Sequence, residues 1–193
     1  MELTKRQKEI IEASMKLIGE GGIQSLTIKN LSSEIGVSES AIYRHFSSKT
    51  EVLSTLLDFL TSIVHAHYKE VEEMEGNSFE KIQKMISGQL KIFSDNPHYA
   101  IVILSDGLFK YENSLHEKIK GITHNARKTF LKVIEEGTAK GEIRNDVPCD
   151  QIAFVIMGSV RLTVTQWSIS GFAFDLIERG KILLNTITTL IQK

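Results

Sequence analysis

The sequence LTIKNLSSEIGVSESAIYRHFSSK, from Leu26 to Lys49, predicts two short helices joined by a tight turn. The first helix begins at Thr27, whose hydroxyl group can accept a hydrogen bond from a free backbone N–H. Gly36 ends this helix, because glycine adopts the positive φ of a helix C-terminus at little cost. Ser38 then caps a second helix, with acidic Glu39 in its first turn. This order is typical of a helix-turn-helix.

The second helix has one apolar face and one polar face. Ile42 and Phe46 form the apolar face. The polar face carries Ser38, Ser40, Tyr43, Arg44 and His45. A helix this short is not stable alone, so it must be held on a small three-helix core. Held in this way, its polar face is suited to the major groove of DNA.

These motifs resemble the DNA-binding domain of TetR-family transcriptional regulators. The similarity rests on the turn GVS at 36–38, on YRHF at 43–46 and on the lysine at 49. It implies an all-α chain of about nine helices. It also implies a helix-turn-helix DNA-binding domain at residues 1–49 and a helical effector-binding and dimerisation domain at residues 50–193.

The resemblance assigns roles to the residues of the motif. Tyr43, His45 and Lys49 are expected on DNA phosphates, and so is Thr27 at its helix N-terminus. Hydroxyl groups and the Ala41 methyl are expected to reach base edges. The full set of expected DNA-binding residues is Thr27, Ser38, Ser40, Ala41, Tyr43, Arg44, His45 and Lys49. An alternative remains open, in which Tyr43 and His45 only cover the small core and Arg44 points sideways.

Apolar periodicity predicts further helices along the whole chain. They are expected at residues 4–20, 48–73, 78–94, 98–109, 112–140, 150–168 and 174–192. Thr4 and Gln7 are spaced as a capping box, and the glycines at 21 and 22 should end the first helix. The sequence contains no run with strand periodicity.

Charge gives little general signal for nucleic-acid binding. The 193 residues carry a formal net charge of −1, and residues 1–49 hold seven Lys and Arg against six Asp and Glu. Affinity for DNA should therefore depend on the placement of a few cations and helix N-termini, and on two copies binding together.

The composition fits a soluble cytoplasmic protein with no membrane segment. Cys149 is the single cysteine, which excludes an internal disulfide and suits a reducing compartment. At the start of a helix it is either a redox switch or a semi-buried structural thiol. No apolar run reaches the roughly 18 residues of a membrane span, and the segment at 152–164 is interrupted by Gly158, Ser159 and Arg161.

The sequence contains no catalytic motif, so we expect that the protein is not an enzyme and that it binds no cofactor. His65 and His67 are two residues apart and face different sides of a helix, while His116 and His124 are eight apart. Neither pair has the spacing of a metal site, so no bound metal is expected.

The resemblance implies a pocket for a small, lipophilic effector among the middle helices. The candidate lining residues are Phe59, Ile63, His67, Phe93, Leu104, Phe109, Phe130, Arg161, Thr165 and Trp167. Each of these is at least as well explained by ordinary helical core. Arg161 must find a partner across a dimer, meet an anionic ligand or face water.

The last two helices offer small and apolar residues for packing against a second copy. The candidates are Ile156, Gly158, Val160, Gly180, Leu184, Ile187 and Leu190. A dimer would read a near-palindromic operator with half-sites about 34 Å apart or more. Effector binding would then shift the helix at 48–73 and change the distance between the two recognition helices, so that one of them loses the register of its half-site.

A second function class also fits the sequence. The run SAIYRHFSSKT at 40–50, with Asn96-Pro97 later, is also similar to nucleoid-occlusion factors of the same fold. The resemblance then implies a DNA-bound scaffold that contacts a cell-division protein.

Overall fold

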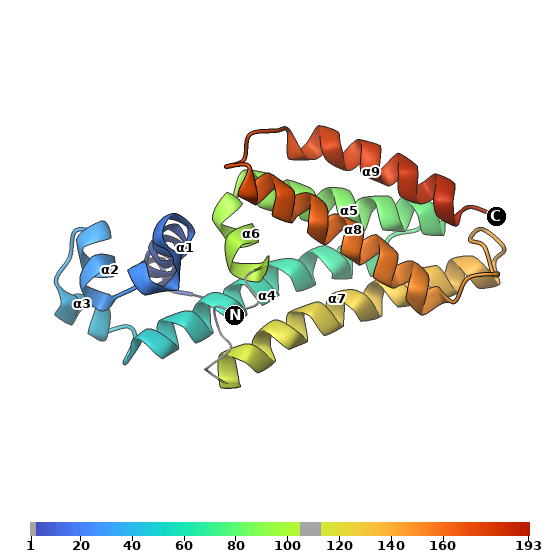
Figure 1. Ribbon diagram of the computed structural model, residues 1–193. Helices are drawn as coiled ribbons and strands as arrows, with labels where there is room; N and C mark the ends of the chain where they lie inside the picture. Colours follow the sequence, from blue (N-terminus) through green and yellow to red (C-terminus); the bar gives the residue numbers. More distant parts are fainter. Residues whose placement is uncertain (1–2, 105–112) are drawn as a thin grey trace. The chain divides into compact units, whose positions relative to one another are not determined.

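The computed structural model describes residues 3–104 and 113–193, and helices account for the named elements in these ranges (Figure 1). The helices are α1 Lys5–Ser25, α2 Ile28–Glu34, α3 Glu39–Tyr43, α4 Lys49–Glu73, α5 Ser78–Asp95, α6 Pro97–Leu104, α7 Asn113–Ala139, α8 Cys149–Ile169 and α9 Leu176–Ile191. These nine helices confirm the all-α fold class within the described ranges. One isolated bridge joins Ile143 to Gln192.

The chain divides into two compact units. The first contains α1, α2, α3, the part of α4 up to Ile63, α6 and the part of α7 up to Lys120. The second comprises Val64–Asn96 and Gly121–Lys193. A division after residue 49, at the end of the expected DNA-binding domain, remains a prediction.

Helix α1 is longer than expected. Thr4 and Gln7 form the expected capping box, but the helix continues past the two glycines to Ser25. Gly22 has a φ of 70° and kinks the helix instead of ending it. Because a glycine has no Cβ, this left-handed conformation costs little, and the chain resumes helical turns beyond it.

The turn between α2 and α3 is a Schellman motif. Gly36 has a φ of 67°, its N–H donates to the carbonyl of Ser33, and the N–H of Val37 donates to the carbonyl of Ser32. These two bonds satisfy carbonyl groups at the end of α2, and Val37 is half-buried as the accompanying apolar contact. The turn predicted from the sequence is therefore present.

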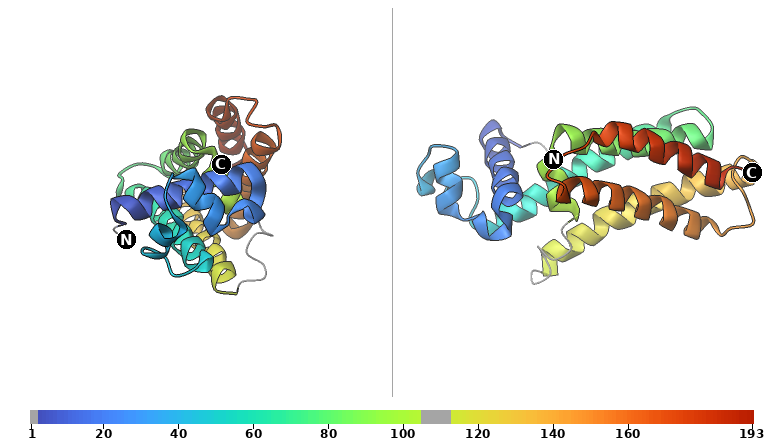
Figure 2. Two further views of the ribbon diagram at one scale, coloured as in Figure 1. Left: turned by 90° about the vertical axis from the view of Figure 1, so that its left-hand side faces the viewer. Right: turned by 45° about the horizontal axis from the view of Figure 1, so that its top comes forward.

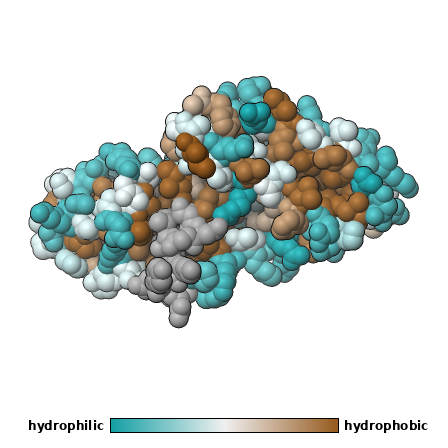
Figure 3. Space-filling view, in the orientation of Figure 1, coloured by the Kyte–Doolittle hydropathy of each residue, from teal (hydrophilic) through white to brown (hydrophobic). Residues whose placement is uncertain are grey.

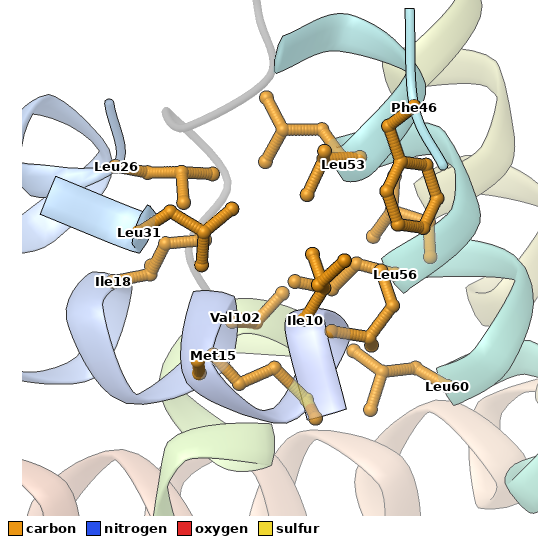
Figure 4. Packing of buried hydrophobic residues seen from close by; sticks show 14 of the residues in the cluster. Ile10, Met15, Ile18, Leu26, Leu31, Phe46, Leu53, Leu56, Leu60 and Val102 are labelled. Atoms are coloured by element: carbon orange, nitrogen blue, oxygen red, sulfur yellow. The ribbon is translucent and has the colours of Figure 1, made fainter. Parts of the chain in front are cut away.

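The core of the first unit joins α1, α2, α3, α4 and α6. Figure 4 shows Ile10 of α1 pointing toward Leu56 of α4, with Val102 of α6 nearby. The side chain of Phe46, which is 2% exposed and follows α3, is also part of this core. A helix from the middle of the chain is therefore part of the hydrophobic core that supports the helix-turn-helix.

Helix α6 approaches α1 closely at Gly19. A Cβ atom on Gly19 would fall 2.0 Å from Nδ1 of His98, far inside van der Waals contact. Among the described residues, this buried Nδ1 atom has no hydrogen-bond partner. With the His98 ring in this position, α1 has room only for glycine at residue 19.

In the second unit, α5 and α8 both pack against α9 (Figures 1 and 2). Gly180 of α9 allows this approach, since a Cβ there would lie 2.3 Å from a methyl group of Leu90. Helix α8 ends in a second Schellman motif, in which Phe172 donates its N–H to the carbonyl of Trp167 and packs its ring on the indole. Phe172 has a φ of 65°, and this edge-to-face ring contact helps to hold it there.

The expected helices agree with the observed ones to within about two residues, apart from α1 and α6. In the described residues α6 ends at Leu104, and the rest of the expected helix at 98–109 lies outside them.

By length and composition, α8 could cross a membrane, and 33% of its most apolar window is buried. The expectation from sequence, that no segment reaches this threshold, is therefore wrong for α8. The helix is 21 residues long, and its Ile, Val, Phe and Leu residues raise its mean hydropathy more than the small residues and Arg161 lower it.

Candidate functional site

Helix α3 presents the expected polar face to solvent. Ser38, Ser40 and Arg44 are exposed, and Tyr43 is 52% exposed. Ala41 is half-buried, while Ile42 is fully buried in the core below. The polar side chains are thus available to a ligand, and Tyr43 does not cover the core.

Two hydroxyl groups flank the start of α3. Ser38 occupies the N-cap position, but its side chain makes no capping bond. Its Oγ lies 2.9 Å from Oγ of Ser40 instead. The capping role expected for Ser38 is therefore corrected, and the paired hydroxyl groups face outward, where each retains capacity for a further hydrogen bond.

Thr27 caps α2 as expected. Its Oγ1 accepts a hydrogen bond from the N–H of Asn30 at 3.0 Å, and the residue is exposed. The hydroxyl proton remains available to a phosphate oxygen at this helix N-terminus.

His45 and Lys49, which were expected to contact DNA phosphates, are less exposed than Tyr43 and Arg44, and both are half-buried. The Nζ atom of Lys49 donates to the carbonyl of Ile23 at 3.2 Å. Lys49 thus has a partner within its own chain, twenty-six residues earlier in the sequence.

The first turn of α4 contains a carboxylate that the sequence analysis did not select. Glu51 accepts hydrogen bonds from the N–H and the hydroxyl of Ser47, both at 2.6 Å. These bonds, first the one from the hydroxyl, hold the pKa of Glu51 below its ordinary value. Serine followed by glutamate four residues later was the available signal.

The candidate pocket residues are divided between the two units. Phe59, Ile63 and Leu104 belong to the first unit, and Phe109 lies outside the described residues. His67, Phe93, Phe130, Arg161, Thr165 and Trp167 belong to the second unit. The assignment of these residues to an effector pocket remains a prediction.

Several of these side chains have packing partners within their unit. Phe130 and Trp167 are buried, and Phe130 meets Tyr68 edge to face at 6.2 Å. Nε2 of His67 lies 3.0 Å from the carbonyl of Met85, so Nε2 carries the proton. The same ring packs on Gly88, where a Cβ would lie 2.0 Å from Cε1. His67 thus fixes the crossing of α4 and α5.

Four of the seven candidate dimer residues pack inside their own chain instead of facing a second copy. Ile156, Val160 and Ile187 are buried, and Gly180 is covered by Leu90. The assignment of the other three residues to a dimer surface remains a prediction. Of the expected set, Gly158 and Leu190 are exposed and Leu184 is half-buried.

The opposite face of α8 carries large apolar side chains in the open. Phe154 is 70% exposed and Ile169 80% exposed, and brown atoms gather over this part of the molecule in Figure 3. The exposed apolar set on α8 and α9 is Phe154, Val155, Leu162, Ile169, Ile182 and Leu190. We call these six residues the α8–α9 apolar face. Their spacing was visible in the sequence, but α8 is apolar on both sides, so the pattern did not indicate which side is covered.

Within the described residues, no three His, Cys, Asp or Glu side chains lie close enough to hold a metal ion. Cys149 is half-buried at the first residue of α8, with Sγ 3.5 Å from Oγ1 of Thr138. Its redox role remains a prediction.

Comparison with known families matches both parts of the chain. Residues 10–56 match the model for bacterial regulatory proteins of the tetR family, and residues 55–191 match the C-terminal region of YsiA-like proteins. The chain belongs to the TetR family. It is therefore a transcriptional regulator of the helix-turn-helix type, as the motif at 26–49 indicates.

Two curated relatives illustrate the range of this family. The chain is 24% identical to the fatty acid metabolism regulator protein of Bacillus subtilis, over 97% of each chain. It is 22% identical to the nucleoid occlusion factor SlmA of Photobacterium profundum, over 89% of this chain and 88% of the relative.

Solved structures share the TetR-family fold over almost the whole chain. The ketosteroid regulator KstR2 of Mycobacterium tuberculosis superposes with a TM-score of 0.85 at 19% identity, covering 100% of this chain and 97% of its own. The regulator FadR of Bacillus subtilis, in complex with stearoyl-CoA, gives a TM-score of 0.79 at 22% identity, covering 94% and 97%.

Proposed function

We propose that this TetR-family regulator is a cytoplasmic, homodimeric repressor that releases a near-palindromic operator when it binds a lipophilic acyl ligand. The observation that carries the proposal is the similarity to a fatty acid metabolism regulator over the full length of both chains. The FadR structure with stearoyl-CoA supports an acyl-CoA thioester as the first effector to test.

The DNA-binding part of the proposal rests on α3. Its exposed hydroxyl groups and Tyr43 form a polar surface on a small rigid core, as recognition of the major groove requires. Ser40 and Ala41 are proposed to read base edges, and Thr27, Tyr43 and His45 to contact phosphates.

The dimer is proposed to form through the α8–α9 apolar face. Large apolar side chains in contact with water favour association. The four residues of this face on α8 share one side of that helix by their spacing, and α8 packs against α9, which carries the other two. Two helices from each copy would then make a four-helix bundle. A dimer also provides two recognition helices, which a near-palindromic operator needs.

The first experiment selects bound duplexes from a random DNA pool with the purified protein at fixed salt, since such affinities depend strongly on salt. A palindromic consensus is expected. Operator affinity is then measured with acyl-CoA of several chain lengths, with coenzyme A and free fatty acids as controls. A switch of about 3 kcal/mol would weaken operator binding about 150-fold. Unchanged affinity with every acyl-CoA would reject this effector class.

A DNA-bound scaffold is the second candidate, favoured by the similarity to SlmA over most of the chain. It would bind DNA without responding to acyl ligands and would retain a division protein only when DNA is present. A pull-down with and without the selected duplex separates the two functions.

A further inference from the structure

The kink at Gly22 disturbs the hydrogen bonds at the end of α1. In a regular helix the carbonyl of Gly22 would accept from Leu26 N–H, and that of Ile23 from Thr27 N–H. Here Leu26 N–H donates to Ile23 at 3.3 Å, and Thr27 N–H donates to Ser25 at 3.0 Å. The carbonyl of Gly22 therefore lacks the donor that a regular helix would provide, whereas the carbonyl groups of Ile23 and Ser25 each accept one backbone N–H and can accept a second hydrogen bond.

Three side chains, from three elements, donate further hydrogen bonds to the carbonyl groups of this junction. Ser25 Oγ donates to the carbonyl groups of Gly22, at 2.7 Å, and of Leu17. Asn30 Nδ2, in α2, donates to the carbonyl of Ser25 at 2.8 Å. From the first residue of α4, Lys49 Nζ donates to the carbonyl of Ile23 at 3.2 Å. The junction between α1 and α2 thus accepts hydrogen bonds from side chains of α1, α2 and α4.

Lys49 is the member of this set that reaches across the fold. It is half-buried, it carries a full charge, and a charged donor forms a stronger hydrogen bond than a neutral one. The start of α4 follows directly after α3, and the junction directly precedes α2. The hydrogen bond from Lys49 to Ile23 therefore links the segment before α2 to the start of α4 and holds both ends of the helix-turn-helix.

We propose that Lys49 is a positioning residue for DNA binding, which holds the α1–α2 junction against the first turn of α4. The TetR-family resemblance assigns this lysine to a phosphate, whereas the bond to Ile23 gives it a role inside the protein. Fixing the two ends of the motif preorganises α3 for its operator. The inference rests on the DNA-binding function proposed above.

The two roles differ in their dependence on salt. Loss of one phosphate contact lowers the slope of log affinity against log salt by about one per subunit and weakens binding to all DNA. Loss of a positioning bond leaves that slope unchanged and weakens the selected operator more than unrelated DNA, because only the operator requires an accurately placed α3.

The test compares Lys49→Met, Ser25→Ala and Lys29→Met with the wild-type chain, using the selected operator and an unrelated duplex over a salt series. Lys29 is exposed on α2, and its side chain makes none of the junction bonds described above, so Lys29→Met removes a charge without removing such a bond. Lys49→Met should weaken operator binding about tenfold with an unchanged salt slope. Ser25→Ala, which removes no charge, should act in the same direction, whereas Lys29→Met should not weaken the selected operator more than the unrelated duplex.

Amide hydrogen exchange in the free protein gives a second readout. Lys49→Met should speed exchange at Leu26 and Thr27, whose N–H groups bond within the junction. A lowered salt slope with equal weakening of both duplexes and unchanged exchange would overturn the proposal. Reduced thermal stability with unchanged operator affinity of the folded protein would also overturn it, since the role would then be structural alone.

Failure of the proposed function would be visible separately, because the wild-type chain would then select no operator. In that case the exchange rates still show whether the bond holds the junction, and a positioning role in DNA binding would be rejected.

Discussion

In the proposed recognition of DNA, the side chains of α3 have different roles according to their chemistry. Ser38 and Ser40 hold their hydroxyl groups 2.9 Å apart at the solvent-facing start of the helix. A hydroxyl group both donates and accepts, so this pair can adapt to different base edges. Tyr43, which is more than half exposed, is better suited to the uniform phosphate backbone.

Tyr43→Ala should therefore weaken binding to every DNA sequence by a similar factor. Ser40→Ala should change the preference among sequences, with about 1–3 kcal/mol of discrimination at the affected base pair. The measurement is a repeated selection from the random pool with each variant. Equal effects of Ser40→Ala on all sequences would remove this residue from base readout.

A second residue-scale effect concerns Glu142. Its carboxylate accepts a hydrogen bond from the N–H of Ser78 at 2.8 Å, at the first turn of α5. This backbone bond is the first cause that lowers the pKa of Glu142 below its ordinary value of 4.5. The negative charge also lies favourably at a helix N-terminus.

Because folding lowers this pKa, the stability due to Glu142 is complete well above pH 4.5 and is lost as the pH falls through the lower, folded-state pKa. Glu142→Gln should therefore be less stable than wild type at pH 7, and the difference should shrink below pH 4.5. Urea unfolding as a function of pH measures it. A difference that is constant with pH would contradict the role of the charge.

At the scale of elements, glycines set how closely helices cross. Gly19 admits the ring of His98 between α1 and α6, Gly88 admits His67 between α4 and α5, and Gly180 admits Leu90 between α9 and α5. In each case a methyl group would fall within 2.3 Å of a side-chain atom. These crossings hold helices from distant parts of the chain together inside each unit.

Gly19→Ala should destabilise the protein by about 1–3 kcal/mol, because overpacking at the His98 ring exceeds the gain in helix propensity. Thermal or urea unfolding measures the change. Gly121→Ala is the matched control, since no neighbouring atom of the described residues lies within 4 Å of a Cβ at that site in α7. The control should be neutral or up to about 1 kcal/mol more stable.

A double substitution tests whether the His98 ring causes this loss of stability. If the ring causes the effect, adding His98→Ala to Gly19→Ala should recover part of the lost stability. Strict additivity of the two substitutions would show that the close approach at Gly19 is not the source of the loss.

At the scale of the whole molecule, the α8–α9 apolar face holds six of the seven large hydrophobic side chains that are exposed among the described residues. Leu162→Arg and Ile169→Arg should each raise the dimer dissociation constant by about 30-fold or more, because a charge would enter an apolar contact twice per dimer. Sedimentation velocity over a concentration series measures this. Gln83→Arg, at an exposed position of α5, is the control and should leave association unchanged.

Association that is unchanged by either arginine would exclude this face as the dimer surface. Loss of operator binding together with loss of the dimer would support the proposed need for two recognition helices.

Local chemistry made the helix-turn-helix predictable from sequence. The glycine turn at Gly36, the cap at Thr27 and the buried Ile42 each depend on residues within a few positions, so their pattern is readable along the chain. The same reasoning failed at Gly22, where helical turns resume beyond a left-handed residue, and at Ser38, whose hydroxyl bonds to Ser40.

The sequence by itself determined the all-α class, the position of the DNA-binding motif and the family of regulators. Tertiary structure alone decided that α6 packs into the core of the DNA-binding unit, that Lys49 bonds to Ile23, and which face of α8 is covered. The physical reason is the distance along the chain between the residues that interact. Caps and turns form between neighbours in the chain, whereas the burial of one of two equally apolar helix faces depends on helices that arrive from elsewhere in the sequence.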